Sequence, residues 1–130
     1  MKNWIYIGIF LDTLTKNLLK QRFSLPEGWK EYCDHMTVVY NDGSELSKIV
    51  KEANKSNMGK RHTLKIVAIG VSEKAIAVKV QLPFGVVCAN KIAHITLGTS
   101  PEGKPVDSND ITIWNDIIPE YINGMMYSIK

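Results

Sequence analysis

The chain has 130 residues, of which 45% are hydrophobic and 22% charged, with only 9 Gly and 5 Pro. This composition is that of a folded globular protein, and it excludes a disordered, collagen-like or low-complexity chain. With 16 basic and 13 acidic residues the net charge is +3, too mild a bias for a protein that holds duplex DNA by its phosphates.

The cysteines and the apolar runs predict where the chain resides. Cys33 and Cys88 are too few for a disulfide framework, which favours a reducing compartment. The longest apolar run, Trp4 to Leu11, has eight residues, against the roughly 20 that a membrane-spanning helix needs. Asp12 follows it at once and no small-residue cleavage site comes after, so we do not expect a secretory signal. We expect a single domain over residues 1–130, located in the cytoplasm and not attached to a membrane.

The first predicted elements are a strand and a helix. Over Trp4 to Leu11, β-branched and aromatic residues alternate in kind between two faces, as in a strand. We expect the aliphatic face to meet the core; it consists of Ile5, Ile7, Ile9 and Leu11. A helix should follow over Leu14 to Phe23, with Asp12 or Thr13 as its N-cap. Its inward residues at helical spacing are Leu14, Leu18 and Leu19.

A second strand and a second helix are predicted next. The strand runs from His35 to Tyr40 and stops at Asn41-Asp42-Gly43, a strong turn signal. Ser44 can cap a helix that runs to about Asn57. Its expected inward residues are Leu46, Ile49, Val50 and Ala53.

The rest of the chain is predicted to consist mainly of strands. They are Thr63 to Val71, Ala75 to Leu82, Ala93 to Thr99, Ile111 to Ile113 and Gly124 to Ile129. We expect the first two to form a hairpin, and a turn or short helix at Asn115 to Asn123 to separate the last two. No linker interrupts the chain, which predicts one α+β domain with a largely antiparallel sheet.

Two of the three histidines are followed by threonine two residues later, in His35-Met36-Thr37-Val38 and His94-Ile95-Thr96-Leu97. With seven threonines in 130 residues, random placement would produce such a pair about 1 time in 100. Residues i and i+2 of a strand project from the same face. Each strand therefore has a polar front with an imidazole and a hydroxyl, and an apolar back for the core.

Two such fronts facing each other suit the cleavage of a phosphodiester. One imidazole can deprotonate a nucleophile while the other protonates the leaving oxygen. The hydroxyls of Thr37 and Thr96 can donate to the non-bridging oxygens, where negative charge must be held. This chemistry requires neither a metal ion nor a cofactor. Strand alternation also argues against Asp34 as a metal ligand beside His35, because its side chain should point to the other face.

The paired motifs, one in each half of the chain, and the opening strand Tyr6 to Leu11 resemble the two-histidine (2H) phosphoesterase superfamily. This superfamily includes the 2′-5′ RNA ligase-like phosphodiesterases and the cyclic phosphodiesterase domains of tRNA ligases. The resemblance spans most of the chain and implies that His35 and His94 are the catalytic histidines and that Thr37 and Thr96 bind phosphate. It also implies the fold of the superfamily, a bilobal arrangement of two antiparallel sheets around a central cleft, with helices outside.

The function implied by the resemblance is that of a metal-independent phosphodiesterase, a hydrolase. We expect its substrate to be an RNA 2′,3′-cyclic phosphate, because most members cleave these or related cyclic nucleotides. Two alternatives stay open. Phage members of the superfamily degrade cyclic oligonucleotide defence signals, and a non-catalytic module could capture nucleotides or RNA ends without turnover. The sequence leaves the oligomeric state and the choice of acid and base histidine undetermined.

Three further residues are candidates for substrate binding. Tyr6 lies on the non-aliphatic face of the first strand, where it could stack on a base or simply pack. Ser108 and Asn109 follow the loop beyond the second motif, and Asn109 could equally be a turn former. Cys33 could share a face with His35 and act as a nucleophile, the alternative being a buried or bystander thiol.

Overall fold

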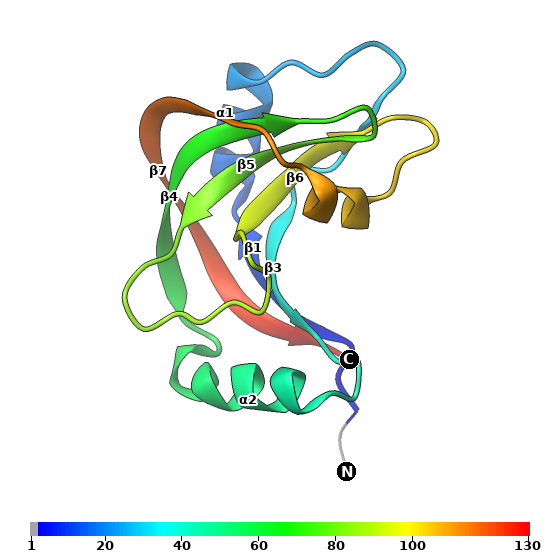
Figure 1. Ribbon diagram of the computed structural model, residues 1–130. Helices are drawn as coiled ribbons and strands as arrows, with labels where there is room; N and C mark the ends of the chain where they lie inside the picture. The colour runs from blue at the N-terminus through cyan, green and yellow to red at the C-terminus, as the bar shows by residue number, and fades with distance from the viewer. Residues whose placement is uncertain (1–2) are drawn as a thin grey trace.

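The computed structural model describes residues 3–130, and strands account for most of its elements (Figure 1). The elements are β1 (Tyr6–Leu11), α1 (Thr13–Arg22), β2 (Lys30–Glu31), β3 (His35–Tyr40), α2 (Glu45–Ala53), the 3-10 helix η1 (Lys55–Asn57), β4 (Arg61–Val71), β5 (Ala75–Gln81), β6 (His94–Thr99), the 3-10 helix η2 (Pro105–Asp110) and β7 (Trp114–Ile129). In this described part of the chain, no helix combines the length and the apolar character needed to cross a membrane.

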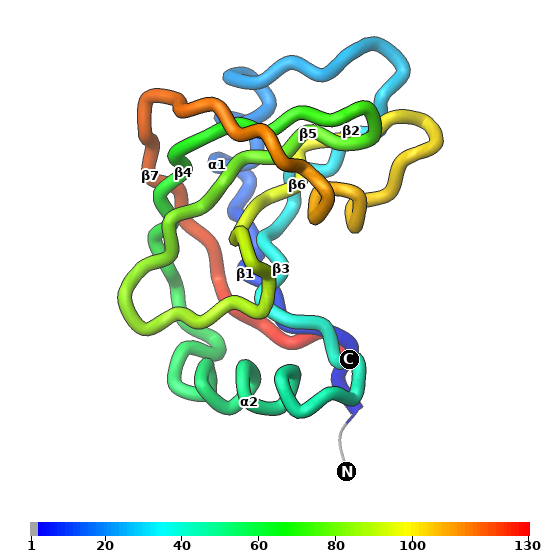
Figure 2. Tube along the Cα trace, in the orientation of Figure 1, coloured from blue at the N-terminus to red at the C-terminus, as the bar shows by residue number. Residues whose placement is uncertain are grey.

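The strands form one antiparallel barrel. They pair in the order β2-β6-β3-β1-β7-β4-β5, and β5 pairs in addition with β6, so that six strands close on themselves. Figure 2 shows β6, β3 and β1 running side by side. The expected bilobal α+β fold with two sheets around a central cleft is therefore wrong. Because β6 is hydrogen-bonded to both β3 and β5, it joins what would be two sheets into one.

The interior of the barrel is filled by the aliphatic face of each strand. Ile7 and Ile9 of β1, which alternation predicts to point inward, are fully buried, as are Met36 of β3 and Ile95 of β6. Ile5, predicted on the same face, is exposed because it lies before the start of β1. Since side chains alternate along a strand, the intervening residues of β1, β3 and β6 project from the outer face of the barrel.

Both helices bury a narrower face than their apolar spacing predicts. Each places one aliphatic side chain in the core, Leu19 from α1 and Val50 from α2. The other apolar residues of the predicted inner faces are exposed: Leu14, Leu18, Leu46, Ile49 and Ala53. A barrel fills its interior with its own strand side chains, so a helix beside it has less apolar surface to cover than a helix on an open sheet.

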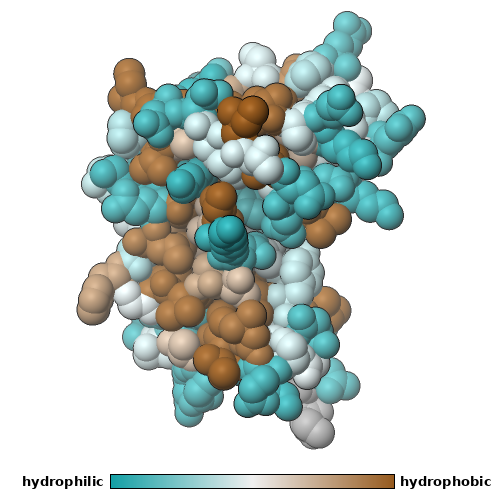
Figure 3. Space-filling model, viewed as in Figure 1, coloured by the Kyte–Doolittle hydropathy of each residue, from teal (hydrophilic) through white to brown (hydrophobic). Residues whose placement is uncertain are grey.

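Helix α2 ends earlier than predicted because a buried asparagine terminates it. The helix stops at Ala53 rather than near Asn57. The side-chain Nδ2 of Asn54, which is fully buried, donates to the carbonyls of Val50 at 2.9 Å and Val87 at 2.7 Å. Its Oδ1 accepts from the backbone N–H of Val87 at 3.1 Å. These bonds tie the end of α2 to the loop between β5 and β6, over which apolar residues gather in Figure 3.

The C-terminal part of the barrel differs most from the sequence prediction. Ile111 to Ile113 do not form a strand, and neither a turn nor a short helix interrupts residues 115–123. Instead β7 runs from Trp114 to Ile129 and pairs with both β4 and β1. Pro119 lies at a register shift between β4 and β7, a place where a strand tolerates proline because no ladder hydrogen bond is required of it.

Candidate active site

The two His-x-Thr motifs meet at the seam where β3 and β6 close the barrel. The strands are antiparallel, with Met36 opposite Ile95, and both of these side chains are fully buried. The flanking histidine and threonine of each motif consequently point away from the interior. The strands run in opposite directions from the Met36–Ile95 pair. Each imidazole therefore lies beside the threonine of the other motif.

The outer face of this seam carries a pocket of about 310 Å³ that is lined by all four motif residues, His35, Thr37, His94 and Thr96. Asn109, one of the candidate substrate-binding residues, lines it as well. The polar fronts of the motifs therefore share one face of one barrel, whereas the resemblance placed them across a cleft between two sheets.

His94 is held in one tautomer by the backbone. Its Nδ1 lies 2.8 Å from the carbonyl oxygen of Ile92, which can only accept a hydrogen bond, so Nδ1 carries the hydrogen and donates it. The residue is buried, with 8% of its surface exposed. Because Nδ1 is occupied, Nε2 is the ring nitrogen left to exchange a proton with a substrate.

His35 lies between aromatic rings and a carboxylate. Its ring centroid is 5.4 Å from that of Tyr6 and 5.2 Å from that of Phe10. Its Nδ1 is 3.7 Å from Oδ2 of Asp34, an ion-pair distance longer than a hydrogen bond, and this nitrogen has no hydrogen-bond partner among the described residues. Burial lowers the pKa of His35, and the negative charge of Asp34 opposes that effect.

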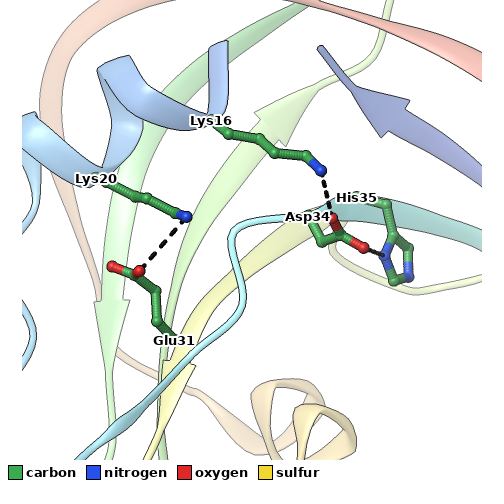
Figure 4. Close-up of polar contacts among 5 residues, drawn as sticks. All are labelled: Lys16, Lys20, Glu31, Asp34 and His35. Atoms are coloured by element: carbon green, nitrogen blue, oxygen red, sulfur yellow. Dashed lines mark ion pairs between the residues drawn. The ribbon is translucent and has the colours of Figure 1, made fainter. Parts of the chain in front are cut away.

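Asp34 reaches His35 because the strand alternation is broken just before β3. Cys33 has a φ of 57°, in the left-handed region that residues other than glycine rarely adopt. The prediction that Asp34 points away from His35 is therefore wrong. Figure 4 shows Lys16 of α1 on the other side of Asp34, with its Nζ 2.7 Å from Oδ1. Lys16 holds the pKa of Asp34 below its usual range.

Ser108 lies behind Thr96 rather than in the pocket of the motif residues. Its Oγ is 2.8 Å from the Oγ1 of Thr96, and only 1% of Ser108 is exposed. The other neighbour of the Thr96 hydroxyl is the carbonyl oxygen of Pro105, at 3.5 Å. Ser108 was a candidate for direct substrate binding. In the structure its hydroxyl contacts that of Thr96, and the residue lines a second, adjoining pocket, so its role in substrate binding stays a prediction.

A second pocket, of about 480 Å³, adjoins the first. The two share three lining residues, Asn90, His94 and Asn109, and the second is also lined by Lys91 and Trp114. The sequence indicates Asn109 as a candidate but not Asn90, which lies in the loop between β5 and β6. No periodicity or motif marks that loop, so its position beside the histidine is set by the chain path alone.

Tyr6 and Gly8 of β1 shape the surroundings of His35. The Tyr6 ring packs against the rings of His35 and Tyr40, and it does not line the 310 Å³ pocket. A Cβ atom at Gly8 would lie 3.2 Å from Cδ2 of His35 and 3.3 Å from the carbonyl oxygen of Met36. This close approach cannot be foreseen from the sequence, because it arises from a neighbouring strand.

The thiol near His35 is not activated. Cys33 is buried, and burial raises its pKa to about 11, which disfavours the thiolate that a nucleophile requires. This supports the bystander alternative for Cys33. Over residues 3–130, no three side chains of His, Cys, Asp or Glu are grouped closely enough to hold a metal ion.

Comparisons with known proteins identify the family. Residues 13–118, which include both motifs, match the model of the fungal tRNA ligase phosphodiesterase domain. Curated proteins give no match. Among solved structures, a chain described as a fungal RNA kinase matches with a TM-score of 0.70 over 99% of this chain at 15% identity, which shows the fold alone. This chain spans 46% of that one. The resemblance to the two-histidine superfamily is confirmed, and the chain belongs to its family of fungal tRNA ligase phosphodiesterase domains.

Proposed function

We propose that this protein hydrolyses the 2′,3′-cyclic phosphate at the end of an RNA, using the two histidines and two threonines of its motifs. The observation that carries this proposal is the single pocket of about 310 Å³ lined by His35, Thr37, His94 and Thr96. These groups can perform two proton transfers and stabilise the charge that develops on phosphorus-bound oxygens. Membership in a family of tRNA ligase phosphodiesterase domains supports RNA as the substrate class.

His35 is the general base in this proposal, and Asp34 is its positioning residue. The lowered pKa of His35 keeps its imidazole neutral and able to accept a proton from water. Asp34, near Nδ1, favours the tautomer that carries hydrogen on that nitrogen and stabilises the imidazolium that forms. A carboxylate has the same effect on the histidine of a Ser-His-Asp triad.

His94 is the general acid. Its Nδ1–H donates to the carbonyl of Ile92, and this bond orients the ring and leaves Nε2 as the nitrogen that meets the substrate. The proton on Nε2 then passes to the ribose oxygen that leaves phosphorus. In this proposal the Ser108 hydroxyl is the donor of the bond to Thr96, and the Thr96 hydrogen turns from the carbonyl of Pro105, 3.5 Å away, to a non-bridging phosphate oxygen.

The atoms of the proposed step balance as follows. The oxygen of water bonds to phosphorus, and the bond from phosphorus to one of the two ribose oxygens breaks. His35 takes a proton from the water and His94 gives one to the released ribose oxygen. The product is a ribose monophosphate beside a free hydroxyl. The four motif side chains supply both proton transfers and the charge stabilisation, so the step uses neither a metal ion nor a cofactor.

The direct test is a phosphodiesterase assay in EDTA on 2′,3′-cyclic mononucleotides and on an RNA oligomer with a cyclic phosphate end. We expect wild-type turnover and a loss of several orders of magnitude in His35→Ala and in His94→Ala. His62→Ala is the matched control, because its Nε2 bonds the carbonyl of Asn57 and it lines neither the 310 nor the 480 Å³ pocket. Turnover that EDTA abolishes, or that survives both motif variants, would contradict the proposal.

The roles of the two histidines are tested with an aryl phosphodiester whose leaving group needs no proton. Turnover of this substrate should return in His94→Ala, which lacks the acid, but stay low in His35→Ala, which lacks the base. The opposite pattern would exchange the two roles. Equal loss in both variants would contradict the division into acid and base.

The adjoining pocket favours one second candidate function. Its volume of about 480 Å³ beside His94 gives room for another nucleotide unit, so a cyclic oligonucleotide is the second candidate substrate. Comparing kcat/KM for cyclic oligonucleotides and for the cyclic-ended RNA distinguishes the two. Stoichiometric capture without product would instead favour a binding module.

We propose the cytosol as the compartment, in keeping with two free cysteines.

A further inference from the structure

A row of aromatic rings crosses the outer face of the barrel and includes the proposed base. The centroids of neighbouring rings are separated by 5.3 Å from Tyr40 to Tyr6 and by 5.4 Å from Tyr6 to His35. The next separations are 5.2 Å from His35 to Phe10 and 6.5 Å from Phe10 to Tyr127. We call Tyr40, Tyr6, Phe10 and Tyr127 the aromatic row.

The strand registers explain why these rings share one face. Tyr6 pairs with Tyr40 and Phe10 pairs with His35 across β1 and β3, while Tyr127 of β7 pairs with Gly8 of β1. All of them occupy outward positions, between the residues that fill the interior. Tyr40 and Tyr127 are 57% and 46% exposed, although large aromatic side chains are usually well buried. The barrel thus presents flat apolar surfaces to solvent on both sides of His35.

One end of the aromatic row borders a further pocket of about 260 Å³. Phe10 and Tyr127 line it, together with Asn123, Arg61 and the acidic residue Asp12. The Arg61 side chain is 65% exposed, and its closest carboxylate, that of Asp12, is 3.8 Å away. The pocket therefore combines two aromatic residues, an amide residue and a cationic group that can meet a phosphate.

We infer that the aromatic row and this pocket hold the single-stranded RNA whose cyclic phosphate end lies at His35. The inference rests on the proposed function and deepens it, because it names a polymer end rather than a mononucleotide as the substrate. Stacking on aromatic side chains suits any base, since every base has a π-face. Only an unpaired, unstacked base exposes the face that such stacking needs, so the bound RNA is single-stranded.

Binding is tested with a 5′-labelled RNA of about six nucleotides that ends in a stable 3′-phosphate. Fluorescence anisotropy should show Tyr127→Leu binding this RNA about ten-fold more weakly than wild type, because leucine keeps the apolar bulk but removes the ring. Tyr127→Phe should bind like wild type. Tyr121→Leu is the matched control, since Tyr121 is an exposed tyrosine on the same strand that lies beside Lys65, outside the aromatic row.

Kinetics provide a second measurement. The ratio of kcat/KM for the cyclic-ended RNA to kcat/KM for the 2′,3′-cyclic mononucleotide should fall about ten-fold in Tyr127→Leu. Tyr121→Leu should leave that ratio at its wild-type value. Thermal unfolding of each variant establishes that it is folded, which the exposure of both tyrosines favours.

The outcomes separate this inference from the proposed function. If wild type turns over the mononucleotide but neither affinity nor the kcat/KM ratio depends on Tyr127, the aromatic row is overturned and the proposed function stands. If RNA binding depends on Tyr127 but neither substrate is turned over, the row stands and the proposed function fails. Self-association that Tyr127→Leu abolishes, without RNA binding, would assign this face to a second copy of the chain and overturn the inference.

Discussion

Ser108→Ala and Thr96→Val remove opposite ends of one hydrogen bond, and burial predicts that their costs differ. The two hydroxyl oxygens are 2.8 Å apart, with Ser108 buried and Thr96 at the pocket. Ser108→Ala leaves the Thr96 hydroxyl where water can bond it, so the free energy of unfolding should fall by about 1 kcal/mol. Thr96→Val keeps the side-chain shape but leaves the buried Ser108 hydroxyl without its partner, which should cost about 1–3 kcal/mol.

Thermal unfolding measures this difference. For a domain of this size, 1 kcal/mol corresponds to roughly 3–5 °C in Tm. Thr96→Val should therefore unfold several degrees below Ser108→Ala. The double variant should resemble Ser108→Ala, because removing both hydroxyls leaves no buried group without a partner. Thr63→Val is a control with little expected effect, since the bond from its hydroxyl to Asn123 is exposed.

Activity should follow the same order, because Thr96 is the proposed phosphate donor and Ser108 only supports it. Thr96→Val removes the group that we propose bonds the phosphate and should lower kcat by about 10²-fold. Ser108→Ala keeps that donor but orients it less well, so a loss of about ten-fold is expected. If Thr96→Val destabilises no more than Ser108→Ala, and the two costs add in the double variant, the hydroxyls are not coupled and the reasoning is refuted.

Three other substitutions test positioning and stability. Asp34→Asn removes the negative charge that opposes the effect of burial on the pKa of His35, so this pKa should fall further. The acidic limb of the kcat/KM profile, which requires neutral His35, should then move to lower pH. An acidic limb that stays in place would contradict the assignment of His35 as the base. Gly8→Ala puts a Cβ 3.2 Å from Cδ2 of His35 and should shift the His35 ring by a few tenths of an ångström. We expect kcat to fall by about ten-fold with little change in Tm. A wild-type kcat in this variant would show that the ring position is not critical. Asn54→Ala leaves the N–H and carbonyl of Val87 without their side-chain partner. The free energy of unfolding, measured by urea titration, should fall by about 2–4 kcal/mol. A loss below about 1 kcal/mol would refute that estimate.

The elements that depend on local pattern were predictable. The bounds of β3, His35–Tyr40, agree with the prediction, and β4 and β5 form the expected antiparallel hairpin. The inward positions Ile7 and Ile9 of β1 are also confirmed. These features follow from alternation, turn residues and β-branched content, each of which is read within one short segment.

The elements that depend on distant partners were not predictable. The segment from Asn115 to Asn123, which contains Pro119, indicates a turn or short helix when taken alone, yet a register shift against β4 accommodates it inside one long strand. Asp34 lies beside His35 because it precedes the first residue of β3, next to the left-handed Cys33, where strand alternation does not hold, and no local signal marks this departure. In both cases the decisive contact comes from a part of the chain far away in sequence or from an exception to the usual backbone preferences.

The sequence by itself determined the family and the two motifs. It also determined the side-chain alternation that places the histidine and threonine of each motif on the same face of their strand. Period-two alternation is a property of a single strand, so it needs no knowledge of the neighbours. Only the tertiary structure decided that β6 closes the sheet into a barrel, that one pocket gathers both motifs, and that Ser108 and Asp34 support them. Pairing partners and loop positions arise from contacts between segments far apart in the chain, and such contacts leave no periodic trace within either segment.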